Sequence, residues 1–193
     1  MLNEDLSSQY EPFKLIVENI ENNAAFIGAG IESRVYRTDL ASGSYAIKIA
    51  QKNARNARDR IKDRGLMTKS KINSGMKAIG INGLEQFVTG SIEDCAAIYQ
   101  FVDGIRLNDI DVINTEVITA EQKEKLYQTI AEATEVGLAF DNANPSGANA
   151  FYNPINGFTL IDYSEAYWPV TYQENWSAAI RSLGPIALQA FAN

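Results

Sequence analysis

The sequence has 193 residues, of which 46% are hydrophobic and 21% charged, and its 17 basic and 24 acidic residues give a formal net charge of −7. This length suits one domain or two small lobes around a cleft, and the acidic balance argues against non-specific binding to nucleic acid. Histidine is absent and Cys95 is the single cysteine, which excludes Ser-His-Asp and Cys-His catalysis, ordinary zinc sites and an internal disulfide.

The first part of the chain reads as a helix followed by strands. Apolar residues recur at helical spacing over 6–20, which predicts an entry helix. Over 24–49 the pattern predicts a strand, a turn, a strand, a turn and a strand, with the second turn at 39–43.

A basic segment and two further strands follow. Residues 54–79 are rich in Lys and Arg with scattered apolar residues, which predicts one or two helices with a break near Gly65 or Gly75. Strands are expected over 86–89 and 96–102, joined by a short acidic turn. With the earlier three, they complete an expected set of five.

The second half begins with the clearest helix, over 119–138. Thr119 can cap it, and Glu121 and Gln122 lie in its first turn. A loop rich in Asp and Asn, two short apolar strands and, over 172–191, two short helices are expected beyond it. No stretch approaches the roughly 20 apolar residues of a membrane span. The polar N-terminus does not read as a signal peptide, so a reduced, aqueous compartment is expected.

A glycine pair lies between the first two expected strands, in Phe26-Ile-Gly-Ala-Gly-Ile-Glu-Ser-Arg-Val-Tyr36. Gly28 and Gly30 are placed in a tight turn, where the missing Cβ lets backbone N–H groups approach a polyphosphate. Lys48 ends the next strand and supplies a positive charge for the same phosphates. A plain hairpin would use the same glycines, so the lysine is what favours a phosphate site.

Polar residues around the second strand pair form another candidate site. Asp141 and Asn149 lie in the Asp/Asn-rich loop, and Asp162 ends the second short strand. Carboxylate and amide oxygens suit a hard cation such as Mg²⁺. Asn-Pro and Ser-Gly pairs also make plain turns. The order of these residues after the glycine pair and Lys48 favours phosphoryl transfer.

This order of motifs resembles the protein-kinase signature set. The resemblance covers about residues 26–166 and implies an α+β fold, a minimal two-lobed protein-kinase-like domain. Its N-lobe would hold a five-stranded antiparallel sheet with one helix, and its C-lobe would be helical and truncated. A single domain over 1–193 is expected, with the N-lobe and entry helix over about 1–102 and the C-lobe over about 103–193.

The resemblance also implies roles for individual residues. Lys48 and Asp141 would be catalytic, Asn149 and Asp162 would hold Mg²⁺, and Tyr99 would take the gatekeeper position. The nucleotide, ATP, would be bound by Gly28, Ala29, Gly30, Ser33, Val35, Ala46, Lys48, Gln100 and Val102.

Two departures from the kinase pattern leave alternatives open. The catalytic loop lacks its usual histidine, and Asn149 lies eight residues after Asp141 instead of the usual five. Either Asp141 is the catalytic acid/base, or Asn144 fills the aspartate position of an inactive nucleotide binder. The helix that usually pairs a glutamate with the strand lysine has none, and Asp63 or Asp59 would replace it.

Only 31 residues follow Asp162, so the chain looks like the minimal kinases of the bacterial type III effector class, the HopBF, OspG and NleH types. That resemblance implies secretion into the host cytoplasm and phosphorylation of a host protein on Ser, Thr or Tyr, for example a chaperone such as HSP90. One alternative is a pseudokinase or nucleotide-binding scaffold that engages a partner such as a ubiquitin-conjugating enzyme. The other is a small-molecule phosphotransferase.

Overall fold

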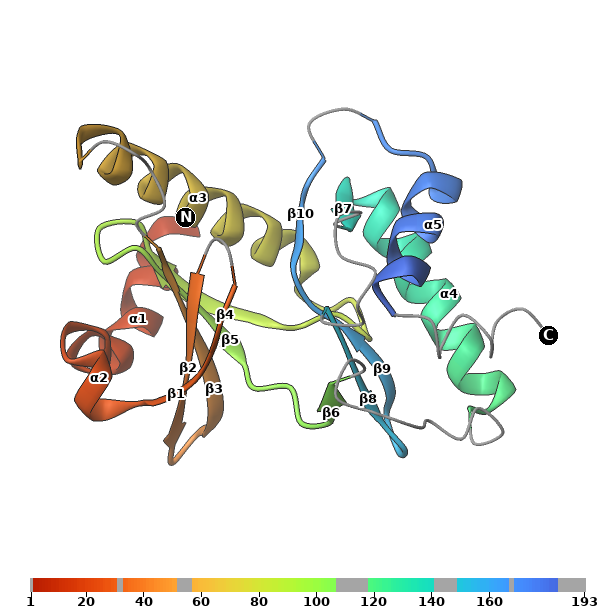
Figure 1. Ribbon diagram of the computed structural model, residues 1–193, viewed down its shortest axis with the longest axis horizontal. Coiled ribbons are helices and arrows are strands. Elements are labelled where there is room, and N and C mark those ends of the chain that lie inside the picture. The colour runs from red at the N-terminus through yellow and green to blue at the C-terminus, as the bar shows by residue number, and fades with distance from the viewer. Residues whose placement is uncertain are drawn as a thin grey trace. The chain divides into compact units, whose positions relative to one another are not determined.

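The computed structural model describes residues 2–30, 33–51, 57–106, 118–140, 149–166 and 169–183. It divides into two compact units, Met1–Met76 with Gln86–Phe101, and Lys77–Glu85 with Val102–Asn193 (Figure 1). The sequence did not predict that 77–85 lies with the second unit, and the assignment of the whole chain to one domain stays a prediction. No described helix is long and apolar enough to cross a membrane.

The first unit is built on a five-stranded antiparallel sheet with strand order β1-β2-β3-β5-β4, as predicted. The strands are β1 (Ala25–Ala29), β2 (Ser33–Leu40), β3 (Gly43–Ala50), β4 (Phe87–Ser91) and β5 (Ala96–Gln100), and the helices are α1 (Leu2–Glu18), α2 (Ile20–Asn23) and α3 (Ala57–Ala78). α1 begins four residues before the predicted start, because its polar first turn carries no apolar periodicity.

One face of this sheet is covered by α1. Tyr36, Ile47 and Ile98 lie opposite one another on β2, β3 and β5. They pack with Tyr10 and Phe13 of α1 into one core cluster, in which every one of these side chains is at most 6% exposed. Because successive strand residues point to opposite faces, the neighbouring positions on β2 and β3 face away from α1.

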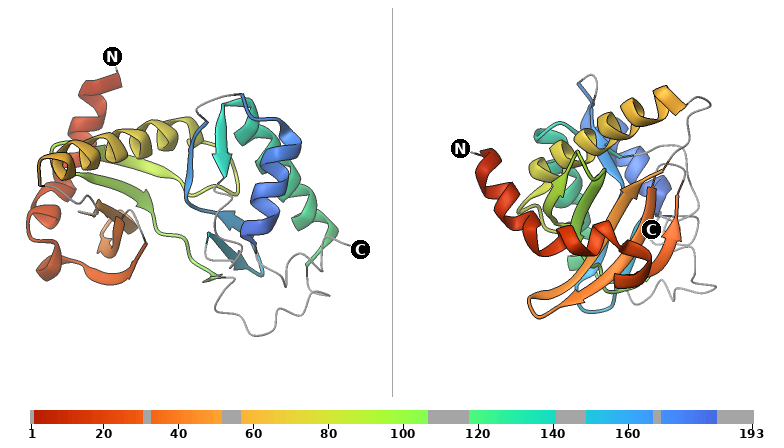
Figure 2. Two further views of the ribbon diagram at one scale, coloured as in Figure 1. Left: turned by 45° about the horizontal axis from the view of Figure 1, so that its top comes forward. Right: turned by 90° about the vertical axis from the view of Figure 1, so that its left-hand side faces the viewer.

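The opposite face packs against α3, which runs alongside β4 and β5 (Figure 2). Ile72 of α3 joins Phe87, Ala97 and Tyr99 in a second core cluster. The Tyr99 hydroxyl also donates to the Lys71 carbonyl oxygen at 3.1 Å. Apolar packing and this hydrogen bond therefore hold the helix to the sheet.

The predicted break in the basic segment was wrong, since α3 is one continuous helix. A Cβ at Gly75 would lie 2.6 Å from the Phe87 ring, and one at Gly65 would lie 3.8 Å from Ile92. Gly75 thus allows the helix to approach the sheet closely and does not bend it. Sequence alone cannot separate these two uses of glycine.

The described part of the second unit holds two helices and two small sheets. The helices are α4 (Ala120–Glu135) and α5 (Tyr172–Ser182). β7 (Leu138–Phe140) pairs with β10 (Tyr163–Glu165), and β6 (Ile105–Arg106), β8 (Ala150–Asn153) and β9 (Gly157–Leu160) form a sheet in the order β6-β8-β9. The predicted strand pair is thus confirmed, and the rest of the predicted helical segment beyond α5 lies largely outside the described residues.

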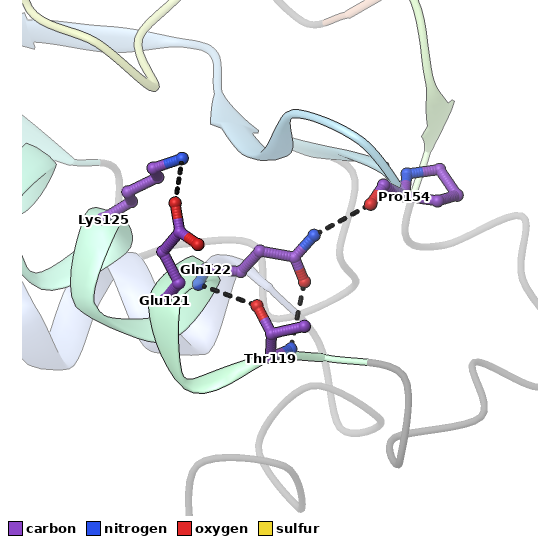
Figure 3. A network of polar contacts seen from close by, with 5 residues as sticks. All are labelled: Thr119, Glu121, Gln122, Lys125 and Pro154. Carbon is purple, nitrogen blue, oxygen red and sulfur yellow. Dashed lines mark hydrogen bonds and ion pairs between the residues drawn. The ribbon is translucent and has the colours of Figure 1, made fainter.

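The start of α4 confirms the predicted cap. The Thr119 hydroxyl accepts from the Gln122 N–H at 3.2 Å, and the Gln122 side-chain oxygen accepts from the Thr119 N–H at 3.1 Å, forming a capping box (Figure 3). The Gln122 amide nitrogen also donates to the Pro154 carbonyl at 3.0 Å. The cap therefore ties α4 to the turn between β8 and β9.

The predicted end of this helix, at residue 138, was wrong. Gly137 has a φ of 74°, a left-handed conformation that ends helices and that glycine adopts without steric cost. Leu138 then begins β7 and is fully buried. Its apolar side chain continued the helical periodicity, which is why the sequence pattern included it.

Candidate functional site

Gly28 lies within β1 and not in a turn, which corrects the sequence prediction. Gly30 lies beyond the end of β1, and its N–H donates to the Ser33 carbonyl at 2.9 Å. A Cβ at Gly28 would meet no described atom within 4 Å, and its φ is not in the left-handed range. Neither packing nor backbone conformation therefore demands glycine here, and the open space leaves room for a ligand to approach the strand backbone.

Gly28, Val35 and Lys48 occupy paired positions on three adjacent strands. Gly28 pairs with Val35, and Val35 pairs with Lys48. Directly paired residues in antiparallel strands point to the same face, so Val35 and Lys48 share the face opposite α1. Ala46 lies two residues before Lys48 and therefore on that face too, whereas Ala29 lies on the other face and would contribute its backbone.

Lys48 is only 7% exposed, and its ammonium nitrogen lies 4.6 Å from the centroid of the Tyr99 ring. Lysine is rarely buried to this degree, because its charge loses hydration. The face of the Tyr99 ring compensates part of that cost through a cation–π contact. A buried lysine on the same sheet face as Val35, two strands away from Gly28, is a candidate group for binding an anion.

At the end of β5, two backbone N–H groups of the segment expected to meet adenine are already hydrogen-bonded within the protein. The Gln100 N–H donates to the Gln86 carbonyl at 2.8 Å, and the Phe101 N–H donates to the Ser44 carbonyl at 2.9 Å. These two N–H groups are engaged within the protein and are not offered to an adenine ring. Val102 is the first residue of the second unit.

In the second unit, Asn149 and Asp162 lie at the same end of the β8–β9 hairpin. Ala150 pairs with Leu160, and the Asn149 carbonyl accepts from the Ile161 N–H at 2.9 Å. Asp162 directly follows Ile161, two residues beyond the strand that the sequence expected it to end. Residues 13 positions apart in the chain thus become neighbours through strand pairing.

The backbone of Asp162 is left-handed, with a φ of 63°. A non-glycine residue in this region costs of order 1–3 kcal/mol and is held there by its surroundings, and such strain gathers at functional sites. Aspartate tolerates the conformation better than most residues do. The strain singles out Asp162 as the candidate functional residue of this hairpin.

The oxygen donors at this hairpin end fit Mg²⁺. Magnesium is usually bound through one or two carboxylates, with water and substrate phosphates completing an octahedron. Asp162 supplies a carboxylate and Asn149 an amide oxygen. Among the described residues no group of three or more His, Cys, Asp or Glu side chains could hold a metal ion, so a bound ion would depend on phosphate oxygens as well.

Tyr163, the residue after Asp162, is 5% exposed. Burial raises the pKa of its phenol well above the ordinary value, and the negative charge of Glu85 raises it further. The hydroxyl is therefore protonated at neutral pH and acts as a hydrogen-bond donor.

The roles of all the predicted site residues stay predictions, and for four of the residues the structure describes no side chain. Asp141 and Asn144 lie outside the described residues, so the choice between them as the catalytic-loop residue is open. Asp59 and Asp63 lie on α3, but their side chains fall outside the description, and which of them pairs with Lys48 stays open as well.

Sequence reasoning missed two residues that fix the backbone next to these positions. Asn175 of α5 is 1% exposed and bonds to the backbone edge of β7 that does not pair with β10, directly before Asp141. The Gln51 amide donates to the Gly30 carbonyl at 3.1 Å and so holds the end of the glycine strand. Asn175 lies in the helical segment expected over 172–191, but no local pattern in the sequence indicated its bonds to β7.

No family model matches this sequence, and no curated protein matches it. Solved structures do match. PpkA-294 in its apo form is 19% identical, with a TM-score of 0.52 over 71% of this chain and 56% of that one. The kinase domain of PknI from M. tuberculosis is 16% identical, with a TM-score of 0.55 over 88% of this chain and 72% of that one.

These likenesses establish the class of fold. The chain has a mixed α+β, protein-kinase-like fold, as the sequence motifs predicted. The chain spans about 56% of the PpkA chain that it matches. At these identities the likeness concerns the fold, and the activity has to be argued from the residues of this chain.

Proposed function

We propose that this chain is an ATP- and Mg²⁺-dependent protein kinase. The observation that carries the proposal is the buried Lys48 in register with Val35 and Gly28. A cation on the sheet face, two strands away from a glycine that packing does not require, suits a polyphosphate. The kinase-like fold and the Asn149–Asp162 pair in the second unit support the same reading.

The proposed roles follow from the chemistry of each side chain. Lys48 binds the α- and β-phosphates, and the backbone of β1 through Ser33 covers them. Asn149 and Asp162 hold Mg²⁺, which neutralises phosphate charge as it develops. Asp141 accepts the proton of the substrate hydroxyl while that oxygen forms a bond to the γ-phosphorus. The bond from the γ-phosphorus to the bridging oxygen breaks, and ADP leaves with those electrons.

The proposed substrate is a protein of a eukaryotic host cell, and the proposed setting is a bacterial effector secreted into the host cytoplasm. Both rest on the resemblance of the motifs to the HopBF, OspG and NleH types. A chaperone such as HSP90 is one candidate substrate. A ubiquitin-conjugating enzyme is a candidate partner if the chain acts as a scaffold.

The test is phosphate transfer from γ-labelled Mg-ATP in eukaryotic cytosolic extract. Asp162→Asn keeps the size of the side chain and its tolerance of a left-handed backbone but removes the charge. Asp39→Asn makes the same change at an exposed carboxylate of β2, where it contacts Arg37, and serves as the matched control. We expect a labelled protein with the wild type and the control, and a loss of at least about 100-fold with Asp162→Asn.

Other outcomes select the alternatives. Nucleotide binding without transfer in the wild type would identify a scaffold, and label in a small compound without labelled protein would identify a small-molecule phosphotransferase. Lys48→Ala should also reduce turnover severely. A near-normal rate in that variant would remove Lys48 from the proposed site.

A further inference from the structure

Residues 82–85 form a fixed segment in the second unit. The Thr129 hydroxyl of α4 shares its proton between the Asn82 carbonyl oxygen at 2.7 Å and the Lys125 carbonyl oxygen of its own helix at 2.8 Å. Gly83 has a φ of 83°, and a Cβ there would overlap the same hydroxyl, so the backbone approaches α4 as closely as glycine permits. The segment is therefore held against α4 by a hydrogen bond and by close packing.

The strand that leads to Asp162 is bonded to this segment. The Leu160 N–H donates to the Gly83 carbonyl at 2.8 Å, and the Glu85 N–H donates to the Leu160 carbonyl at 3.0 Å. Leu160 thus joins the segment by both of its backbone groups, in a short parallel bridge that also involves Leu84. The chain is fixed two residues before Asp162.

The residue after Asp162 is bonded to the same segment. The Tyr163 hydroxyl donates to the Glu85 carbonyl oxygen, and the side chain is part of the buried core of the unit. Tyr163 also pairs with Phe140 across β10 and β7. A phenylalanine would fill the same space and keep that strand pairing, but it would make no bond to Glu85.

We propose that the Tyr163 hydroxyl is a positioning group that holds Asp162 in its left-handed conformation for metal binding. The inference rests on the proposed function, in which Asp162 binds Mg²⁺. Asp162 lies between two residues that are both hydrogen-bonded to the segment 82–85, Leu160 before it and Tyr163 after it. Of these two, Tyr163 alone attaches through a side chain, so a single-atom substitution can remove its contribution.

The matched pair of variants is Tyr163→Phe and Tyr152→Phe. Tyr152 lies in the same core and is also 5% exposed, but its hydroxyl donates to the Gln122 side chain of α4 at 3.3 Å. Both variants lose one buried hydroxyl hydrogen bond, so a general effect on stability appears in both. Only Tyr163→Phe releases the backbone beside Asp162.

Two measurements use the full chain. Amide hydrogen exchange without ligand follows the N–H groups of Ile161 and Ala166, which bond to Asn149 and Gly137 on either side of Asp162. Titration of Mg²⁺ with a fluorescent ATP analogue gives the concentration for half-maximal binding. One buried hydrogen bond corresponds to a factor of about ten, so we expect about tenfold faster exchange and an about tenfold higher Mg²⁺ requirement in Tyr163→Phe alone.

Equal exchange in the two variants would overturn the inference, and so would an unchanged Mg²⁺ requirement in Tyr163→Phe. Failure of the proposed function is a separate observation. If the wild type shows no Mg²⁺-dependent nucleotide binding, the metal role of Asp162 is refuted together with the inference, whatever the exchange rates. If the wild type binds nucleotide in a Mg²⁺-dependent way, and Tyr163→Phe has the same exchange rates and Mg²⁺ requirement as Tyr152→Phe, only the inference is refuted.

Discussion

Asn175→Ala should destabilise the second unit strongly. β10 pairs with one edge of β7, and the Asn175 side chain takes the other. Its oxygen accepts from the Phe140 N–H at 3.1 Å, and its nitrogen donates to the Leu138 carbonyl at 2.7 Å and to the Thr134 hydroxyl at 2.9 Å. Alanine can make none of these bonds.

The magnitude follows from the groups left without a partner. The Phe140 N–H and the Leu138 carbonyl belong to residues that are at most 6% exposed. Each unsatisfied buried group costs about 1–3 kcal/mol, so the two predict a loss of about 2–6 kcal/mol. Thr134 is not counted, because its hydroxyl still donates to the Ile130 carbonyl. This loss is a large part of the about 5–15 kcal/mol that stabilises a typical domain.

Urea unfolding of wild type and variant measures the difference. Asn153→Ala is the matched control, since the Asn153 oxygen accepts from the N–H groups of Ile155 and Asn156 in an exposed turn. Water can replace those bonds, so we expect a loss below about 1 kcal/mol there. A loss for Asn175→Ala no larger than for this control would refute the reasoning. Thr134→Val should fall between the two.

Two further predictions concern glycine and pH. Gly28→Ala should leave the free energy of unfolding nearly unchanged but raise the KM for ATP. Gly75→Ala should lower the free energy of unfolding by about 1–3 kcal/mol, because the new Cβ would overlap the Phe87 ring. Equal losses of stability in the two variants would contradict this prediction. The backbone N–H of Thr171, and then its hydroxyl, lower the pKa of Glu174. That carboxylate stabilises the fold above its unfolded pKa and stops doing so as the pH falls through its folded pKa. The melting temperature of the wild type should therefore fall more steeply below about pH 4 than that of Glu174→Gln, and parallel curves would exclude this contribution.

Local patterns in the sequence determined the first sheet and the start of α4. Apolar, β-branched segments separated by turn residues marked β2 and β3. Thr119 and Gln122 marked the capping box, because both partners lie within one helical turn. The order of glycine, lysine and aspartate along the chain indicated the kinase-like fold that the solved structures share.

Other features were decided by tertiary structure alone. Gly75 looked like a helix break until the Phe87 ring was found against it, and Leu138 looked helical until Gly137 ended α4. Asn175 gave no local signal for its bonds to β7, which lies more than thirty residues away. Periodicity reports the geometry of a few neighbouring residues. Contacts between distant segments depend on how those segments pack, so only the folded chain shows which residue fixes the backbone beside Asp141 and Asp162.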